Sequence, residues 1–349
     1  MKKKLLSVLM AAVMVAGVGG VGAAQVKADD EKILGAGIYS ASDNFNSYIG
    51  KAITNACDGI FKTNIEDGQN DQSTQNNQVD TMLAKGASAV AVSVCDVTAA
   101  PTLIQKCKDA GNVPIIFFNK EITDYDVINS YENAYQVTST GGDYGASIQA
   151  QMVIDYWKEH PEMDKNGDGK LQLVYLMGDP GHTASQPRCD YLKSTIEDAG
   201  IEIDLLAEDT GMWVTATAKE KMDAWVSKYG DEIECCVAGN DAMALGALSA
   251  VEAAGFNTDG EESSKYIPIY GIDALPEILS KIESGEITGS VLQDAKTQGQ
   301  TIVKMAENLT SGKDAVDGIE GVEVEEEAKA VRVPYQAITK DNLDLAKST

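Results

Sequence analysis

Residues 164–172, DKNGDGKLQ, carry oxygen-bearing side chains at alternate positions, a spacing that suits a calcium ion. Positions 1, 3, 5, 7 and 9 of a calcium loop of the EF-hand type would be filled by Asp164, Asn166, Asp168, Lys170 (through its carbonyl) and Gln172. Gly169 stands at the sharp turn, but position 12, normally a bidentate glutamate, is Tyr175. The apolar run that follows, LQLVYLMG, is typical of a strand rather than a helix. The motif therefore leaves two interpretations: a calcium site with a carboxylate from elsewhere, or a surface turn without metal.

The elements around this loop alternate between short apolar strands and longer segments of helical period. Strands are expected at 33–40, 87–94, 113–119, 171–178, 202–209, 234–240 and 266–273. Helices are expected at 46–62, 72–86, 99–111, 143–158, 185–199, 215–228, 241–254 and 274–284. The alternation predicts parallel sheets with helices on both faces, and its restart after VTSTGGDYG indicates two doubly wound α/β lobes.

Polar and aromatic residues stand where the predicted strands end, which is where open parallel sheets bind ligands. The strand ends read IYSASDNF, FFNKE, MGDPGH, DTGMW, AGND and GIDALP. Planar polar groups pair with hydroxyls and aromatic faces pack on ring C–H surfaces, so this composition suits a sugar. Neither a G-x-G-x-x-G nor a Walker loop occurs at a strand–helix turn, and a nucleotide site therefore lacks support.

The N-terminal segment, residues 1–28, has the charged start, apolar run and V-x-A ending of a signal peptide; the alternative is an uncleaved membrane anchor. Its removal would leave 24 basic and 54 acidic residues, a net charge of −30, which argues against nucleic acid and anionic membranes as partners. The six cysteines are irregularly spaced and form no C-x-x-C motif, so buried free thiols are expected rather than a disulfide framework.

The same segments carry a family resemblance over nearly the whole mature chain. IYSASDNF, GQNDQSTQNNQVDTMLAKG, FFNKE, GDPGH, DTGMW, AKEKMDAW, GNDAMALGA, GIDALPE and VRVPY occur in the expected order, and the chain resembles the galactose/glucose-binding proteins of bacterial sugar ABC transporters. The resemblance implies the type I periplasmic binding protein fold, two Rossmann-like lobes joined by a three-segment hinge. The lobes would comprise residues 29–138 with 296–333, and 139–295 with 334–349, with crossings near 138–142, 293–295 and 332–336.

The resemblance also implies two sets of binding residues. One structural calcium ion would be completed by Glu234, in EIECCVAGN. The sugar would be bound by Asp43 with its neighbour Tyr39, by the aromatic pair Phe45 and Trp213, and by Asn119, His182, Arg188, Asn240, Asp273 and Gln293. Two simpler roles stay open, because Asp43 could be a helix N-cap and Trp213 an ordinary core residue.

Two positions depart from the family pattern on the C1–C2 side of the sugar. The family has Asp where Ala184 stands and Asn where Gln293 stands. The loss at Ala184 would leave Arg188 less compensated, and it predicts either weaker binding of free galactose or glucose, or room for a C1 substituent as in a glycoside. One lost charge-assisted hydrogen bond costs about 1.5–3 kcal/mol.

The function implied is that of a secreted, non-enzymatic sugar-binding protein of the periplasm or cell surface. Closing of the hinge around the sugar would present the protein to an ABC permease, with a chemoreceptor as a further candidate partner, and a monomer is expected. An alternative is a sensor that presents its closed form to a receptor kinase without transport. An enzyme using Asp43 and Asp273 as a glycosidase pair is disfavoured, because many hydroxyl contacts and two aromatic clamps suit ground-state binding.

Overall fold

The computed structural model describes residues 32–261 and 263–347, so the expected signal peptide, residues 1–28, lies outside the described residues. The first sheet has seven strands, all parallel except the pair β11–β12. Their order across the sheet is β11 (Glu323–Glu325), β12 (Ala330–Val333), β5 (Ala134–Ser139), β4 (Ile115–Phe118), β3 (Ala89–Val92), β1 (Ile33–Ile38) and β2 (Lys62–Asp67).

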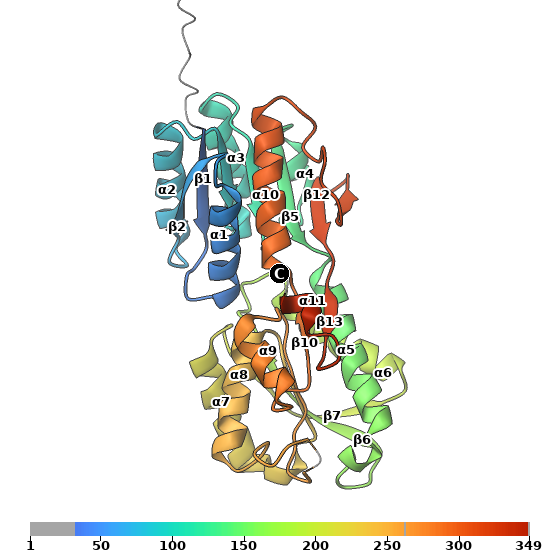
Figure 1. Ribbon diagram of the computed structural model, residues 1–349. Helices are drawn as coiled ribbons and strands as arrows, with labels where there is room; N and C mark the ends of the chain where they lie inside the picture. The colour runs from blue at the N-terminus through green and yellow to red at the C-terminus, as the bar shows by residue number, and fades with distance from the viewer. Residues whose placement is uncertain (1–31, 262, 348–349) are drawn as a thin grey trace, which may run out of the picture. The chain divides into compact units, whose positions relative to one another are not determined.

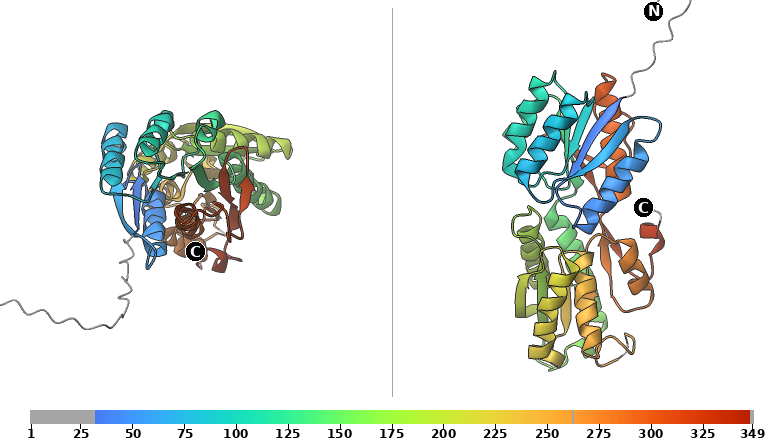
Figure 2. Two further views of the ribbon diagram at one scale, coloured as in Figure 1. Left: turned by 90° about the horizontal axis from the view of Figure 1, so that it is seen from above. Right: turned by 90° about the vertical axis from the view of Figure 1, so that its left-hand side faces the viewer.

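Helices cover both faces of this sheet, as the side chains of β3 show. Ala89 and Ala91 pack into the core beneath α1 (Asn44–Ala56) and α10 (Ala295–Thr310). Val90 and Val92 point to the opposite core, beneath α2 (Gln72–Ala84) and α3 (Ala100–Asp109). Alternate side chains of a strand point to opposite faces, so a strand that is apolar throughout is buried on both. Figure 2 shows the two helical layers; the short α4 (Tyr125–Asn129) leads into β5.

The second sheet has four parallel strands in the order β7 (Glu202–Thr210), β6 (Lys170–Met177), β8 (Cys235–Ala238) and β9 (Ile269–Tyr270). On β6, Leu173 and Tyr175 face a core shared with α5 (Gly142–Glu159) and α6 (Ser185–Asp198). Val174 and Leu176 face the other core, which receives α7 (Thr215–Tyr229), α8 (Asp241–Ala253) and α9 (Pro276–Glu283). Helices α5 and α6 lie side by side, as do α7 and α8 (Figure 1).

Three short segments join the elements of the two sheets. They lie between β5 and α5, between β10 (Ser290–Leu292) and α10, and between β12 and β13 (Gln336–Ile338), the antiparallel partner of β10. The last element described is α11 (Asp344–Lys347). The α/β class, with two doubly wound parallel sheets joined by three segments, is confirmed; the residue boundaries of the lobes stay a prediction.

The sequence interpretation was wrong in one place and incomplete in others. The helix expected at 46–62 ends at Ala56, because Asp58 and Gly59 form a turn in which Gly59 has φ +72°, and residues 62–67 form β2. This edge strand alternates polar and β-branched residues and lacks the apolar run that marks a buried strand. The strand expected at 266–273 keeps only Ile269–Tyr270 in regular pairing. Elements that were not predicted are β5, α4, β10, α10, β11, β12, β13 and α11.

The cysteines behave as small apolar residues. All six are free. The buried ones are Cys57, Cys107, Cys189, Cys235 and Cys236. Cys95 was also expected to be buried, but it lies three residues beyond β3 and is only partly buried. Burial raises the pKa of the Cys95 thiol to about 11, so all but a small fraction of it is protonated at neutral pH.

Candidate functional site

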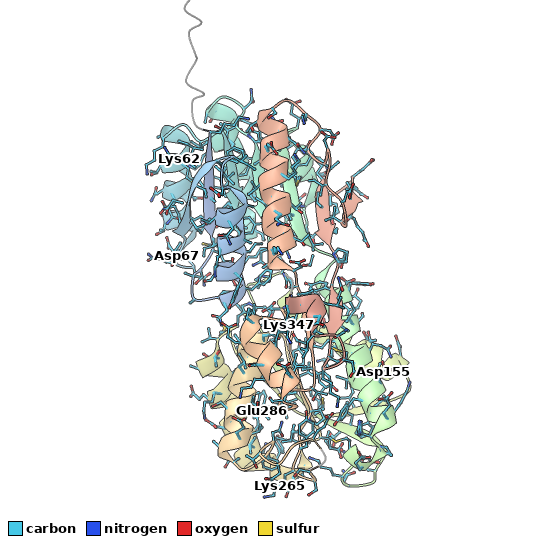
Figure 3. All side chains as sticks on the ribbon, in the orientation of Figure 1. Lys62, Asp67, Asp155, Lys265, Glu286 and Lys347 are labelled. Atoms are coloured by element: carbon cyan, nitrogen blue, oxygen red, sulfur yellow. The ribbon has the colours of Figure 1, made fainter. Side chains whose placement is uncertain are left out.

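The turn after β1 positions the first two predicted sugar residues. Asp43 caps α1, where Oδ1 accepts a hydrogen bond from the backbone amide of Asn46 (3.0 Å), and its Oδ2 accepts one from the hydroxyl of Tyr39. Asp67 on the neighbouring strand β2 (labelled in Figure 3) stabilises this turn, because its Oδ1 accepts a hydrogen bond from the amide of Ala41 (3.1 Å). Asp43 is therefore a helix N-cap. Its other carboxylate oxygen, Oδ2, accepts from Tyr39 and can accept a second hydrogen bond from a sugar hydroxyl.

The turn between β7 and α7 delivers Trp213 with a left-handed backbone, φ +62°. Its indole lies directly on the backbone of Gly178, where an added Cβ would stand 2.0 Å from the ring, and next to Gly239. The rings of Trp213 and His182 meet edge-to-face at 5.4 Å, and the ring of Tyr39 lies 6.1 Å from that of His182. Trp213 is 6% exposed and belongs to a core cluster, yet its indole Nε1 has no hydrogen-bond partner among the described residues. A core role alone does not explain that donor.

His182 is held as a neutral imidazole. Its Nδ1 accepts a hydrogen bond from the amide of Ala184 (3.1 Å), which assigns the ring proton to Nε2. Burial lowers the pKa of His182 well below its ordinary value, and the positive charges of Lys120 and Arg188 lower it further. Near neutral pH the ring therefore offers one N–H donor.

Arg188 is anchored by three acceptors of the protein. Its guanidinium donates to the carbonyl of Gly239 (2.6 Å), to Oε1 of Gln293 (2.9 Å) and to the hydroxyl of Tyr335 (3.1 Å), and it lies 5.6 Å from the Trp213 ring. Gln293 and Tyr335 are neutral acceptors that hold the guanidinium without supplying a negative charge, so the expectation that Ala184 leaves Arg188 less compensated stays a prediction. Its Nε is buried without a partner among the described residues.

The site contains two buried carboxyl groups, that of Asp241 on α8 and that of Asp273 in the turn after β9. Asp241 accepts from the hydroxyl of Ser290 (2.6 Å) and the amide of Leu275 (2.8 Å), and burial raises its pKa to about 7. Asp273 has φ +130°, a strained backbone, and its Oδ2 is buried without a partner in the part of the chain described. Burial raises the pKa of Asp273, the neighbouring Asp241 raises it further, and Arg188 opposes the shift. The free oxygen can bind a hydroxyl whether or not the carboxyl is protonated.

The remaining predicted sugar residues are placed unequally. Asn240 caps α8 through Met243, and its Nδ2 donates to the carbonyl of Trp213 (3.4 Å). Asn119, with φ +63°, lines a cavity of about 840 Å³ together with His182, Arg188 and Gln293. Phe45 is buried in the core beneath α1, and no ring contact with Trp213 or His182 is recorded for it. The clamp formed by Phe45 and Trp213 stays a prediction.

The loop at 164–172 folds around its own carboxylates. Asp164 accepts from the amides of Gly167 (2.8 Å), Asp168 (3.0 Å) and Gly169 (3.0 Å). Glu234, 1% exposed, accepts from the amide of Lys165 with Oε1 (2.7 Å) and from the amide of Gln172 with Oε2 (3.0 Å). The sequence-distant Glu234 is thus tied to both ends of the loop.

The loop offers calcium carboxylate, amide and carbonyl oxygens. Oε1 of Gln172 is buried and lacks a hydrogen-bond partner among the residues described. A bound cation would explain this unpaired acceptor. No three His, Cys, Asp or Glu side chains of residues 32–261 and 263–347 are arranged to hold a metal by themselves, so amide and carbonyl oxygens would have to complete the shell. The residues suit calcium by type, and its binding stays a prediction.

A family model for the periplasmic binding protein domain matches residues 36–314. The chain belongs to this family. A relative, the D-galactose/methyl-galactoside binding periplasmic protein MglB of Haemophilus influenzae, is 42% identical over 89% of this chain and 90% of its own length. A putative rhizopine-binding protein of Rhizobium meliloti is 29% identical over 86% of this chain and 88% of its own length.

Solved structures of periplasmic binding proteins agree with the fold. The chain is similar to an ABC transporter solute-binding protein from Bacillus halodurans with bound myo-inositol, with a TM-score of 0.71 and 27% identity, covering 91% of this chain and 98% of that one. These proteins are described as binding proteins rather than enzymes. Within the described part of this family member, no helix has the length and hydropathy needed to cross a membrane.

Besides Asp241, two buried side chains of the site were not among the predicted residues. Lys120, 2% exposed, places Nζ 3.9 Å from the centre of the Tyr39 ring and donates to the carbonyl of Cys95 (2.9 Å). Tyr335, 6% exposed, holds Arg188. A polar side chain in the strand-end segment FFNKE and an aromatic at the third crossing, VRVPY, were the available signals.

Proposed function

We propose that this periplasmic binding protein captures a hexose of the galactose or glucose type and delivers it to an ABC permease. The observation that carries the proposal is a set of three buried polar atoms without partners in the described structure: the indole Nε1 of Trp213, Nε of Arg188 and Oδ2 of Asp273. Other buried polar atoms also lack partners, but these three belong to predicted sugar-binding residues, and the set supports a ligand that both donates and accepts. Sugar hydroxyls do both.

The electrostatics of the site favour a neutral ligand. His182 is a neutral donor, and the positive charge of Arg188 lies beside the carboxyl of Asp273. An anionic or cationic ligand would add an unpaired buried charge, which is far more costly to bury than a hydroxyl. The 42% identity to a galactose/methyl-galactoside binding protein supports a hexose over other neutral ligands.

The test is calorimetric titration of the mature protein with galactose, glucose, arabinose, xylose and myo-inositol. Saturable one-to-one binding is expected for galactose or glucose, and the sugar is expected to be recovered unchanged, since we assign no catalysis to the chain. A preference for myo-inositol of tenfold or more over both hexoses would contradict the proposed ligand class.

We further propose that the loop at 164–172 binds one structural calcium ion with Glu234. The support is the loop's pattern of carboxylates and amides, the buried acceptor of Gln172, and the double tie from Glu234 to both ends of the loop. Its role would be to hold the loop ahead of β6. Elemental analysis of protein purified without added metal, showing about one calcium per chain, is the expected result.

The partners and location follow from the same proposal. We place the mature protein in the periplasm or at the outer cell surface as a monomer, with a permease as its principal partner and a chemoreceptor as a second. Copurification of a membrane permease with sugar-loaded protein, but not with Trp213→Ala, is the expected outcome.

A further inference from the structure

One cavity, lined in part by four of the predicted hexose residues, also reaches residues outside the predicted set. It has a volume of about 840 Å³, and its lining includes Asn119, His182, Arg188 and Gln293. Pockets of about 300–1,000 Å³ enclose ligands of drug size. The lining continues to Thr138 and Ser139 on β5 and to Val324 and Glu325 on β11, none of which is a predicted hexose residue.

Exposed apolar side chains gather on the same cavity. Tyr144 on α5 is 54% exposed, Tyr191 on α6 is 47% exposed, and Val324 on β11 is 52% exposed. These are three of the seven large apolar side chains exposed among the described residues, and all three line this one cavity. Single exposed apolar residues need no explanation, but a group on one concave surface indicates a binding function. Since α5 and α6 pack against each other, the two tyrosines belong to neighbouring helices (Figure 1).

The rest of this cavity is strongly polar. Arg332, 7% exposed, donates to Glu121 (2.7 Å) and Glu325 (2.7 Å), and all three line the cavity. Carboxylate oxygens have lone pairs left after binding one arginine, so this ion cluster can accept hydrogen bonds from hydroxyls. Aromatic faces beside charged acceptors match the apolar faces and polar rim of a sugar ring better than they match an alkyl chain.

The residue that lines this cavity at position 184 is the small, uncharged Ala184. Arg188, which also lines the cavity, donates hydrogen bonds to Gln293 and Tyr335, so its guanidinium is held in place without an acid at position 184. We propose that the site takes hexosides whose C1 substituent is a second sugar ring, packed against Tyr144 and Tyr191. The proposal rests on the proposed hexose site and names the substrate class of that same site.

The experiment is calorimetric titration of the wild type with galactose, lactose and melibiose, and with glucose, cellobiose and maltose. At least one disaccharide is expected to bind as tightly as its non-reducing hexose, or more tightly. Tyr144→Ala and Tyr191→Ala are each expected to weaken that disaccharide about tenfold, and to leave the free hexose within about twofold. Tyr144→Phe and Tyr191→Phe keep the aromatic face and are expected to retain most of the affinity.

Leu205→Ala is the matched control, because Leu205 is 39% exposed but does not line the cavity. Disaccharides that bind at least a hundredfold more weakly than hexoses would overturn the proposal and leave the hexose site standing. Failure of every mono- and disaccharide to bind would instead overturn the proposed function. Tyrosine variants that bind the disaccharide normally would also refute the subsite, even if they impaired transport, because the tyrosines would then belong to a protein contact.

Discussion

Replacing Glu234 with glutamine tests two proposed roles of this residue separately: binding calcium and accepting hydrogen bonds from the 164–172 loop. Both carboxylate oxygens of Glu234 accept backbone amides, from Lys165 (2.7 Å) and Gln172 (3.0 Å). Glutamine has one acceptor oxygen, so its NH₂ group would face one of these amides, which would lose its partner. A buried donor left unsatisfied costs about 1–3 kcal/mol. Glu234→Gln should therefore lower the free energy of unfolding by this amount even without calcium.

The metal adds a second, calcium-dependent loss. At free calcium of about 100 times Kd, binding to the native state alone stabilises it by about 2.7 kcal/mol. The entropy of unfolding is about 2.1 cal/mol/K per residue, so one kcal/mol shifts the melting temperature of a chain of this length by about 1.5 °C, and calcium should raise that of the wild type by about 4 °C over chelator. Glu234→Gln removes a charged ligand, and the calcium-dependent shift should fall below about 2 °C.

The assay is thermal unfolding of both proteins in calcium and in chelator, with Glu232→Gln as the control. Glu232 is two residues away and exposed, so this variant makes the same charge change without touching the loop amides. If the wild type melts at one temperature in calcium and chelator, and carries no metal by elemental analysis, Glu234 is only a loop clamp. A full calcium shift in Glu234→Gln would show that another group completes the site.

Three further variants address the sugar residues. Trp213→Ala should lower sugar affinity at least a hundredfold by calorimetry, and because it removes a buried indole it should also cost about 3–5 kcal/mol of stability in chemical denaturation. Trp213→Phe keeps a ring face and should lose less affinity and less stability. Equal sugar affinity in the wild type and both variants would show that the Trp213 ring does not contact the sugar. Ala184→Asp should tighten free galactose or glucose about tenfold and weaken their methyl glycosides, since it adds an acceptor and fills the space at C1; weaker hexose binding would refute the assumed orientation. Burial lowers the pKa of His182 in the folded protein, so as pH falls below about 6.5 the imidazole is protonated first in the unfolded chain. The wild type should therefore lose about 1.4 kcal/mol of stability per pH unit relative to His182→Asn. Parallel curves of stability against pH for the two proteins would contradict the buried neutral ring.

The buried strands were predictable from the sequence because their apolar runs are uninterrupted. IIFF and AVAV could only be strands covered on both faces, and their alternation with amphipathic helices fixed the α/β class. β2 was missed because KTNIED is an edge strand with polar residues at every second position. The strands β10 and β13 were missed because three residues each carry too little pattern; they pair only through contacts between distant parts of the chain.

The site shows the same division between local and long-range information. The polar ends of strands located Asp43, Asn240 and Asp273, since each lies within five residues of the end of its strand. The hydrogen bonds from Arg188 to Gln293 and Tyr335 join residues more than 100 positions apart, and no local pattern encodes them. The sequence therefore predicted candidate ligand-binding residues, but not the hydrogen bonds that these residues make to distant parts of the chain.

The most direct test of the central claim is a crystal structure of the mature protein soaked or grown with saturating galactose. We expect sugar hydroxyls within hydrogen-bond distance of Oδ2 of Asp273 and Nε of Arg188, and one face of the pyranose against the ring of Trp213. In the described structure, Oδ2 of Asp273 and Nε of Arg188 are buried without a hydrogen-bond partner. A sugar bound elsewhere, or an empty site with those atoms still unpaired, would contradict the account.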